Sequence, residues 1–193
     1  LDDRWIRTTR RWTLVAWLFL SLGLILGGRW AYDVLGWGGY WAWDPVENAS
    51  LMPWLAATAF LHSVMIQEKR NMFKMWNMFL IVLTYCLVIL GTFVVRSGVI
   101  SSVHSFAQSA IGPFFFAFIT FMFVFSAFWM TKRREDLATE NQISSLLSRE
   151  AAFLYNNFVI IAILAVVFLF TYYPIFSELF TGEKGFVGAP VYE

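Results

Sequence analysis

The sequence predicts an all-α integral membrane protein with about five transmembrane helices. Of the 193 residues, 59% are apolar and only 14% are charged, a composition outside the range of typical soluble domains. The apolar residues gather in long uncharged runs, and about 20 such residues in a helix cross the hydrocarbon core of a bilayer. Helices are the form that these runs must take, because each unpaired backbone group in hydrocarbon costs several kcal/mol.

Five runs are long enough to span a membrane. They cover residues 12–28, 49–66, 75–95, 111–130 and 151–170. The first run ends where Arg29 interrupts the apolar pattern, and the polar stretch 135–150 predicts a solvated or interfacial helix. Because the chain begins with Leu1 and not with Met, we expect a single membrane domain that is a piece of a longer helical bundle.

The basic residues sort the connections into two sides. Eleven of the fourteen lie before the first run, between the second and third, or between the fourth and fifth. An excess of positive charge marks the cytoplasmic side, or the matrix side in a mitochondrion. The outward side then carries the tryptophan-rich segment 30–54, the loop 96–110 and the tail 172–193. The net charge of +1 and the spread of the basic residues give no indication of nucleic-acid binding.

Tryptophan is concentrated in the outward segment. Five of the ten tryptophans lie between Trp30 and Trp54, four of them in the run WGGYWAWDPVENASLMPW of residues 37–54. One interpretation is an aromatic belt, because tryptophan and tyrosine collect at membrane interfaces. A belt does not require glycines between the rings, whereas glycine lets a ligand approach the backbone closely. We favour a platform for a large, flat, apolar ligand such as a porphyrin, formed by Trp37, Gly38, Gly39, Tyr40, Trp41 and Trp43.

The same segment contains the pattern of a helix N-terminus. Asp44 is a capping residue, Pro45 suits the first helical position, and Glu47 stands where a capping box places its carboxylate. A structural role therefore competes with ligand contact for both acids. Pro53 falls further along, where proline kinks or breaks a helix. We expect a short outward helix that leads into the second span.

Two histidines and one cysteine are the remaining candidates for chemistry. His62 lies inside the second run, and either an interhelical hydrogen bond or haem ligation explains an ionisable residue there. His104 lies in the outward loop with Arg96, whose guanidinium could pair with a carboxylate such as a haem propionate. Much of the bilayer separates the two histidines, so they predict two sites. The lone Cys86 excludes an internal disulfide and a Cys-x-x-Cys-His haem attachment site.

Two long motifs resemble a known family. The run of residues 37–54 is similar to the WWD signature of haem-handling proteins in cytochrome c biogenesis. The run RSGVISSVHSFA of residues 96–107 resembles the segment that follows it in the CcmF family, the haem lyase components of the System I machinery, and in the close NrfE paralogues. His62 with its neighbours and the tail residues 187–190 also match that family.

The resemblance implies a function and its partners. Such proteins receive haem from the chaperone CcmE on the WWD segment and promote its thioether attachment to the Cys-x-x-Cys-His motif of apocytochrome c. His104 would be an axial ligand of the delivered haem iron, and His62 an axial ligand of a resident b-type haem that acts as reductant. CcmH and CcmI-type subunits would be partners, in a bacterial inner membrane with the WWD segment facing the periplasm, or in a mitochondrial inner membrane. The implied haem contacts are Trp37, Gly38, Gly39, Tyr40, Trp41, Trp43, Asp44, Pro45, Glu47, Asn48 and Arg96.

The chain also departs from the family pattern. The family is considerably longer, and the second histidine of each haem site has no counterpart here, because the chain has only two histidines. Each site would be half built, with the rest supplied by the remainder of CcmF or by a second CcmF subunit, and we expect this chain alone to be inactive. The alternatives are a haem exporter or presenter, which needs only the outward site, and a membrane cytochrome b subunit that transfers electrons.

Overall fold

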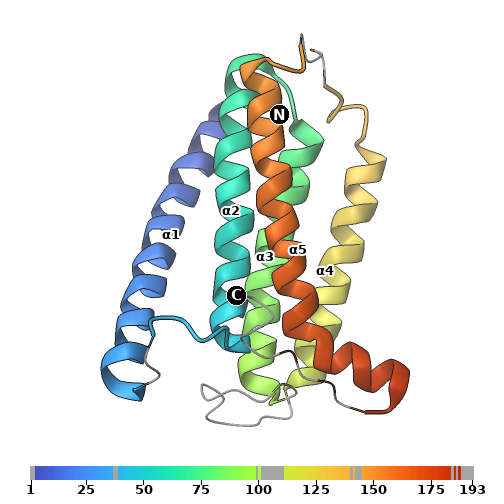
Figure 1. The fold of residues 1–193 in the computed structure, drawn as a ribbon. Helices are drawn as coiled ribbons and strands as arrows, with labels where there is room; N and C mark the ends of the chain where they lie inside the picture. Colours follow the sequence, from blue (N-terminus) through green and yellow to red (C-terminus); the bar gives the residue numbers. More distant parts are fainter. Residues whose placement is uncertain are drawn as a thin grey trace.

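The computed structural model is helical throughout its regular structure, within the residues that it describes. These are residues 3–36, 39–98, 100, 111–139, 141, 145–183, 185 and 187. The helices are α1 (Asp3–Trp30), the π-helical segment η1 (Ala31–Leu35), α2 (Pro45–Arg70), α3 (Lys74–Ser97), α4 (Gly112–Lys132) and α5 (Arg149–Thr181) (Figure 1). Five helices are long and apolar enough to cross a membrane. The predicted all-α class is confirmed.

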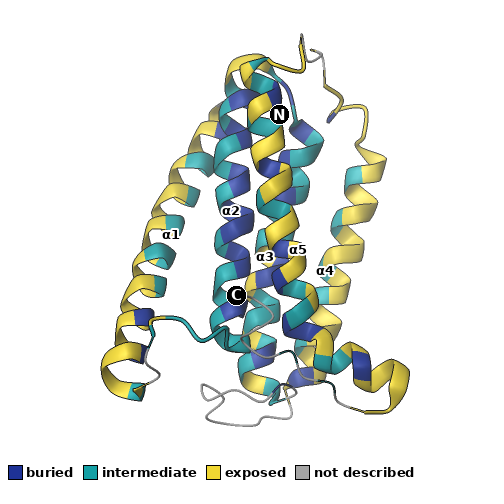
Figure 2. Cartoon of the chain, in the orientation of Figure 1, coloured by how far each residue is buried: buried dark blue, intermediate teal, exposed yellow. Residues whose placement is uncertain are grey.

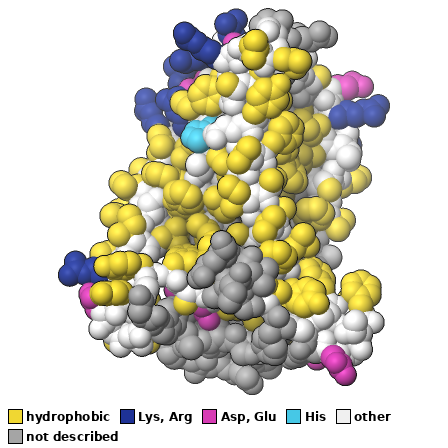
Figure 3. Space-filling view, viewed as in Figure 1, with side chains coloured by type: hydrophobic (Ala, Val, Ile, Leu, Met, Phe, Trp, Pro, Cys, Tyr) yellow, Lys and Arg dark blue, Asp and Glu magenta, His cyan; other side chains and the backbone are white. Residues whose placement is uncertain are grey.

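The second helix is the centre of the bundle. α1, α3 and α5 all pack against α2, whereas α4, among the described helices, packs on α3 alone. Figure 2 shows the result: α2 is largely buried and α4 is almost entirely exposed. The basic side chains gather mainly at one end of a wide apolar surface (Figure 3).

Two indoles join α1 to α2 reciprocally. Trp17 Nε1 on α1 donates to Thr58 Oγ1 on α2 (2.8 Å), and Trp54 Nε1 on α2 donates to Ser21 Oγ on α1 (2.7 Å). The two rings stack with their centroids 5.6 Å apart. Side-chain hydrogen bonds between membrane helices contribute about 0.6 kcal/mol on average, so this pair of bonds orients α1 more than it stabilises the whole bundle.

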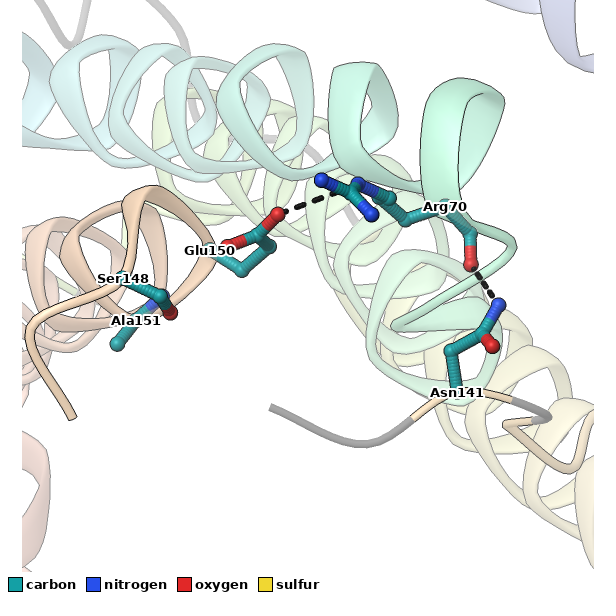
Figure 4. Close-up of polar contacts among 5 residues, drawn as sticks. All are labelled: Arg70, Asn141, Ser148, Glu150 and Ala151. Atoms are coloured by element: carbon teal, nitrogen blue, oxygen red, sulfur yellow. Dashed lines mark hydrogen bonds and ion pairs between the residues drawn. The ribbon is translucent and has the colours of Figure 1, made fainter. Parts of the chain in front are cut away.

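Polar side chains tie α2 to three neighbours at its C-terminal end. Arg10 of α1 pairs with Glu68, and the Arg70 guanidinium lies 3.3 Å from Glu150 of α5. The Asn141 side chain donates to the Arg70 carbonyl (2.7 Å), as drawn in Figure 4. The Ser148 hydroxyl, also drawn there, accepts from the Ala151 amide and caps α5.

A buried polar cluster joins α2 to α3. Its side chains, which hydrogen-bond one another, are those of Ser63, Gln67 and Asn77.

Of the kink or break predicted at Pro53, the break is wrong, because α2 runs through it as one helix. Proline has no amide hydrogen for the carbonyl four residues earlier, which is that of Ala49. That carbonyl lies against Gly91 of α3, where a Cβ would come within 3.3 Å of the oxygen. The missing side chain at Gly91 therefore gives the freed carbonyl room within the α2–α3 contact.

Two connections also differ from expectation. The described residues of 135–150 form turns and irregular structure up to Ser148, and α5 begins at Arg149, so the interfacial helix predicted there is absent from them. The turn at residues 133–137, directly after α4, is held in part by an ion pair between the side chains of Arg133 and Asp136, 3.1 Å apart. α5 continues to Thr181 despite Pro174, so the predicted tail begins as helix.

The close contact at Gly91 generates a prediction for stability. Gly91→Ala should destabilise the protein by about 1–3 kcal/mol, because the methyl group crowds the Ala49 carbonyl in a packed interface. The matched control is Gly23→Ala on α1, where an added Cβ meets nothing within 4 Å. Unfolding of both variants in detergent micelles measures the difference, and equal stabilities would contradict the packing role of Gly91.

Candidate functional site

The described part of the WWD segment, residues 39–54, turns sharply at Trp43. Trp43 has a φ of +56° and is followed by Asp44 in extended geometry. A bulky residue in the left-handed region is an outlier that persists only where surrounding contacts hold it. Such outliers cluster at functional sites; Phe73, before α3, has a similar φ of +63°, but Trp43 is the one of the two that lies in the WWD segment.

Two acids hold the turn by a capping box. Asp44 Oδ2 accepts from the Val46 amide (3.0 Å), and Glu47 Oε2 accepts from the amides of Asp44 (3.4 Å) and Ala42 (3.0 Å). Pro45 occupies the first turn of α2. The capping box expected from the sequence is confirmed, and both carboxylates satisfy backbone donors at the start of the helix.

Asn48 ties the segment to the last helix. Its side chain is 0% exposed and donates through Nδ2 to the Trp43 carbonyl (3.0 Å) and to Thr171 Oγ1 of α5 (3.0 Å). Asp44, Pro45, Glu47 and Asn48 thus have structural positions that shape the segment, whatever further contact they make with a ligand.

The aromatic rings divide between the core and the α1 side. Trp43 packs on the main apolar cluster, and Trp41 meets it edge-on with centroids 6.2 Å apart. Tyr40 is 61% exposed and stacks on Tyr32 of η1 at 4.6 Å. A Cβ at Gly28 would lie 2.7 Å from the Tyr40 carbonyl, so only glycine lets the segment pass this close to α1.

Two apolar clefts between α1 and the start of α2 share Trp41 in their lining. The first encloses about 390 Å³ and the second about 410 Å³, both within the range of ligand pockets. Trp41, Gly28 and Leu24 line both clefts; the first also takes in Gly23, Gly27 and Trp30. Trp41 Nε1 is buried and has no hydrogen-bond partner among the described residues.

The contribution of α1 to this site was missed by sequence reasoning, which treated residues 12–28 only as a span. The visible signal was the pair Gly27 and Gly28 at the end of that run.

The remaining residues predicted for the site lie apart from α1. Gly39 is half-buried beside Trp41, and Arg96 is exposed near the end of α3. Trp37, Gly38 and His104 lie outside the described residues.

His62 occupies a separate position on the α2–α5 contact. Its Nδ1 lies 2.7 Å from Asn156 Nδ2, and the Phe153 ring lies edge-on at 6.3 Å. The interhelical hydrogen bond that was one interpretation of His62 is therefore present. His62 lies 14 residues after Asn48 on the same helix, a separation of about 21 Å at 1.5 Å per residue.

Both positions fit a haem, each in part. At the WWD segment, two apolar clefts lined by Trp41 suit a large ring with few polar atoms. At His62, the Nε2 atom makes no hydrogen bond within the described part of the chain and belongs to a half-buried ring. The imidazole can supply one axial ligand through Nε2 when Nδ1 carries the ring hydrogen and donates it to the Asn156 side-chain oxygen.

The hold of Glu47 on the segment can be tested directly. Glu47→Ala should accelerate hydrogen exchange of the Ala42 and Asp44 amides by about tenfold, because loss of a helix cap costs about 0.5–2 kcal/mol. Mass spectrometry of peptides covering residues 39–46 measures the change. Asp33→Ala is the control, since the exposed Asp33 carboxylate pairs with Arg29 on the surface. Exchange in the Glu47 variant as slow as in the unaltered protein would contradict the role of the Glu47 carboxylate.

Comparison with known proteins gives one family. A family model described as "Cytochrome C assembly protein" matches residues 1–104. The chain is 47% identical over 192 residues to the cytochrome c-type biogenesis protein CycK of Bradyrhizobium diazoefficiens, covering 100% of this chain and 29% of that protein. It is 45% identical over 193 residues to CcmF of Pseudomonas aeruginosa, again covering 100% of this chain and 29% of the relative.

A solved structure agrees with the fold. The cytochrome c haem lyase CcmF superposes with a TM-score of 0.70 at 39% identity, over 90% of this chain and 26% of that one. The chain thus spans less than a third of the length of the relatives it matches. The resemblance to CcmF is confirmed, and the chain belongs to the cytochrome c assembly protein family.

Proposed function

We propose that this chain is part of a cytochrome c haem lyase that receives haem on its WWD segment and promotes thioether attachment to apocytochrome c. The observation that carries the proposal is Trp41, which lines two apolar clefts and whose buried N–H has no partner among the described residues. The family match supports the same assignment. Haem is the substrate here, delivered by the chaperone CcmE, with CcmH and CcmI-type subunits presenting the apocytochrome.

The proposed work of the WWD segment is positioning. Trp41 and Tyr40 supply flat apolar surface, and the capping box fixes the backbone that carries them. Each thiol of the Cys-x-x-Cys-His motif adds its S–H across a vinyl group, and holding both reactants in place supplies much of the rate. His104 would ligand the substrate iron, Arg96 would pair with a propionate, and Trp37, Gly38 and Gly39 would extend the platform.

His62 would hold a resident b-type haem as one of its two axial ligands. That haem, when bound, supplies electrons that keep the iron of the substrate haem reduced. Its position on the α2–α5 contact, about 21 Å along α2 from Asn48, supports a second site distinct from the substrate site. The second ligand of each iron would come from the remainder of CcmF or from another CcmF subunit.

The proposed location is the bacterial inner membrane, with the WWD segment facing the periplasm, or the equivalent mitochondrial membrane. Eleven of the fourteen basic residues lie on the opposite connections, and this charge asymmetry supports that orientation.

A covalent trap tests the lyase function. The complete assembly in membranes, given haem-loaded CcmE and apocytochrome with an intact Cys-x-x-Cys-His motif, should yield haem that stays attached to the cytochrome under denaturing electrophoresis. Apocytochrome with both cysteines changed to serine is the control. Haem that transfers without becoming covalent would point instead to an exporter or presenter and would overturn the proposal.

The platform is tested separately at Trp41. Trp41→Ala should weaken retention of CcmE-delivered haem by about tenfold or more, since an aromatic ring buries about 150–250 Å² and tenfold corresponds to about 1.4 kcal/mol. Transfer of haem to an excess of apomyoglobin measures retention. Trp12→Ala on α1 is the matched control, because that ring is 71% exposed; equal retention in both variants would contradict a platform at Trp41.

A further inference from the structure

We infer that Asn156 is a positioning residue for His62, and that its side-chain amide sets whether Nε2 carries the lone pair that iron requires. The inference rests on the proposed function, in which His62 ligates a resident haem. Asn156 lies on α5 and His62 on α2, 94 residues apart in the chain. The contact of 2.7 Å between Nδ2 and Nδ1 is therefore a product of the fold.

The ring of His62 is held from α5 by two neighbours. Asn156 contacts its Nδ1 edge, and Phe153, one turn earlier on α5, lies edge-on to the ring with an interplanar angle of 64°. Residues three apart share a helix face, so both act from the same side. This arrangement fixes the plane of the imidazole and leaves Nε2 directed elsewhere.

The chemistry of a neutral imidazole makes the amide decisive. One ring nitrogen carries a hydrogen and the other carries the lone pair that a metal requires. When Nδ1 accepts a hydrogen bond from Asn156 Nδ2, the hydrogen lies on Nε2 and that nitrogen has no lone pair for iron. When the amide turns by half a rotation, Oδ1 accepts from Nδ1–H and the lone pair lies on Nε2.

Asparagine suits both situations because one amide offers a donor and an acceptor at nearly the same place. A carboxylate could only accept and would bring a charge into a membrane span, where charged groups are costly. A partner that accepts from the distal ring N–H orients a ligating histidine and raises its basicity. Asn156 can do this without a charge, and it can keep His62 satisfied when no iron is bound.

The neighbouring Asn157 provides an internal control. It is 0% exposed, and neither of its side-chain polar atoms has a hydrogen-bond partner among the described residues. It carries the same amide on the same helix, one position further along, without the contact to His62. Asn156 is exposed and Asn157 is buried, so Asn157→Leu tests the loss of an amide from α5 at the more sensitive position and without loss of the His62 contact.

The experiment compares Asn156→Leu, Asn156→Asp, Asn157→Leu and His62→Ala in the complete membrane assembly. Asn156→Leu should release the resident haem to apomyoglobin about 10- to 100-fold more readily, the usual effect of losing a partner of a metal-bound histidine.

The midpoint potential of the low-spin haem is the second measurement. Asn156→Leu should raise this potential, because the imidazole becomes a weaker donor to iron. Asn156→Asp should lower that potential, since a carboxylate makes the imidazole more basic. Asn157→Leu should leave haem release and potential unchanged.

Opposite shifts from the two Asn156 variants would not result from loosened packing alone. If Asn156→Leu fails to fold, the direction of the potential in Asn156→Asp decides. Unchanged potentials in Asn156→Asp, with the haem spectrum lost in His62→Ala, would overturn the role of Asn156 and leave the haem assignment standing. A low-spin spectrum that survives His62→Ala would overturn both.

Discussion

The capping box at the start of α2 gives the WWD segment its shape. A helix N-terminus leaves four backbone amides without intrahelical partners, and Asp44 accepts from one of them, the Val46 amide. Glu47 accepts from the amides of Ala42 and Asp44, so the capping box also fixes the chain before the helix. The rings of Trp41 and Trp43 are placed by this requirement.

The same helix then carries both candidate sites as one rigid element. α2 is enclosed by α1, α3 and α5, and its continuity through Pro53 depends on room provided by Gly91. The capping box of the WWD segment lies at its N-terminus, and His62 lies about 21 Å further along the helix from Asn48. Under the proposed function, this constant separation would let a resident haem serve the substrate haem without movement of a domain.

Local patterns predicted what is local in the structure. The apolar runs predicted the helices, and the spacing of Asp44 and Glu47 predicted the capping box. The contacts of Tyr40 with Gly28 and of His62 with Asn156 were not predictable, because the partners come from different helices and no periodicity relates them. The error at Pro53 has the same origin, since the compensating Gly91 lies on α3.

Buried polar atoms separate the structural tryptophans from the candidate functional one. Trp17 and Trp54 satisfy their N–H groups across the α1–α2 contact, whereas Trp41, in the same region, does not satisfy its own within the described residues. An unsatisfied buried donor costs about 1–3 kcal/mol. Trp76 has the same defect, but its ring packs between Phe79 and Phe158. Trp41, in addition, lines two apolar clefts between α1 and α2, and the combination of an unmet buried donor with this lining is what favours Trp41 as a ligand contact.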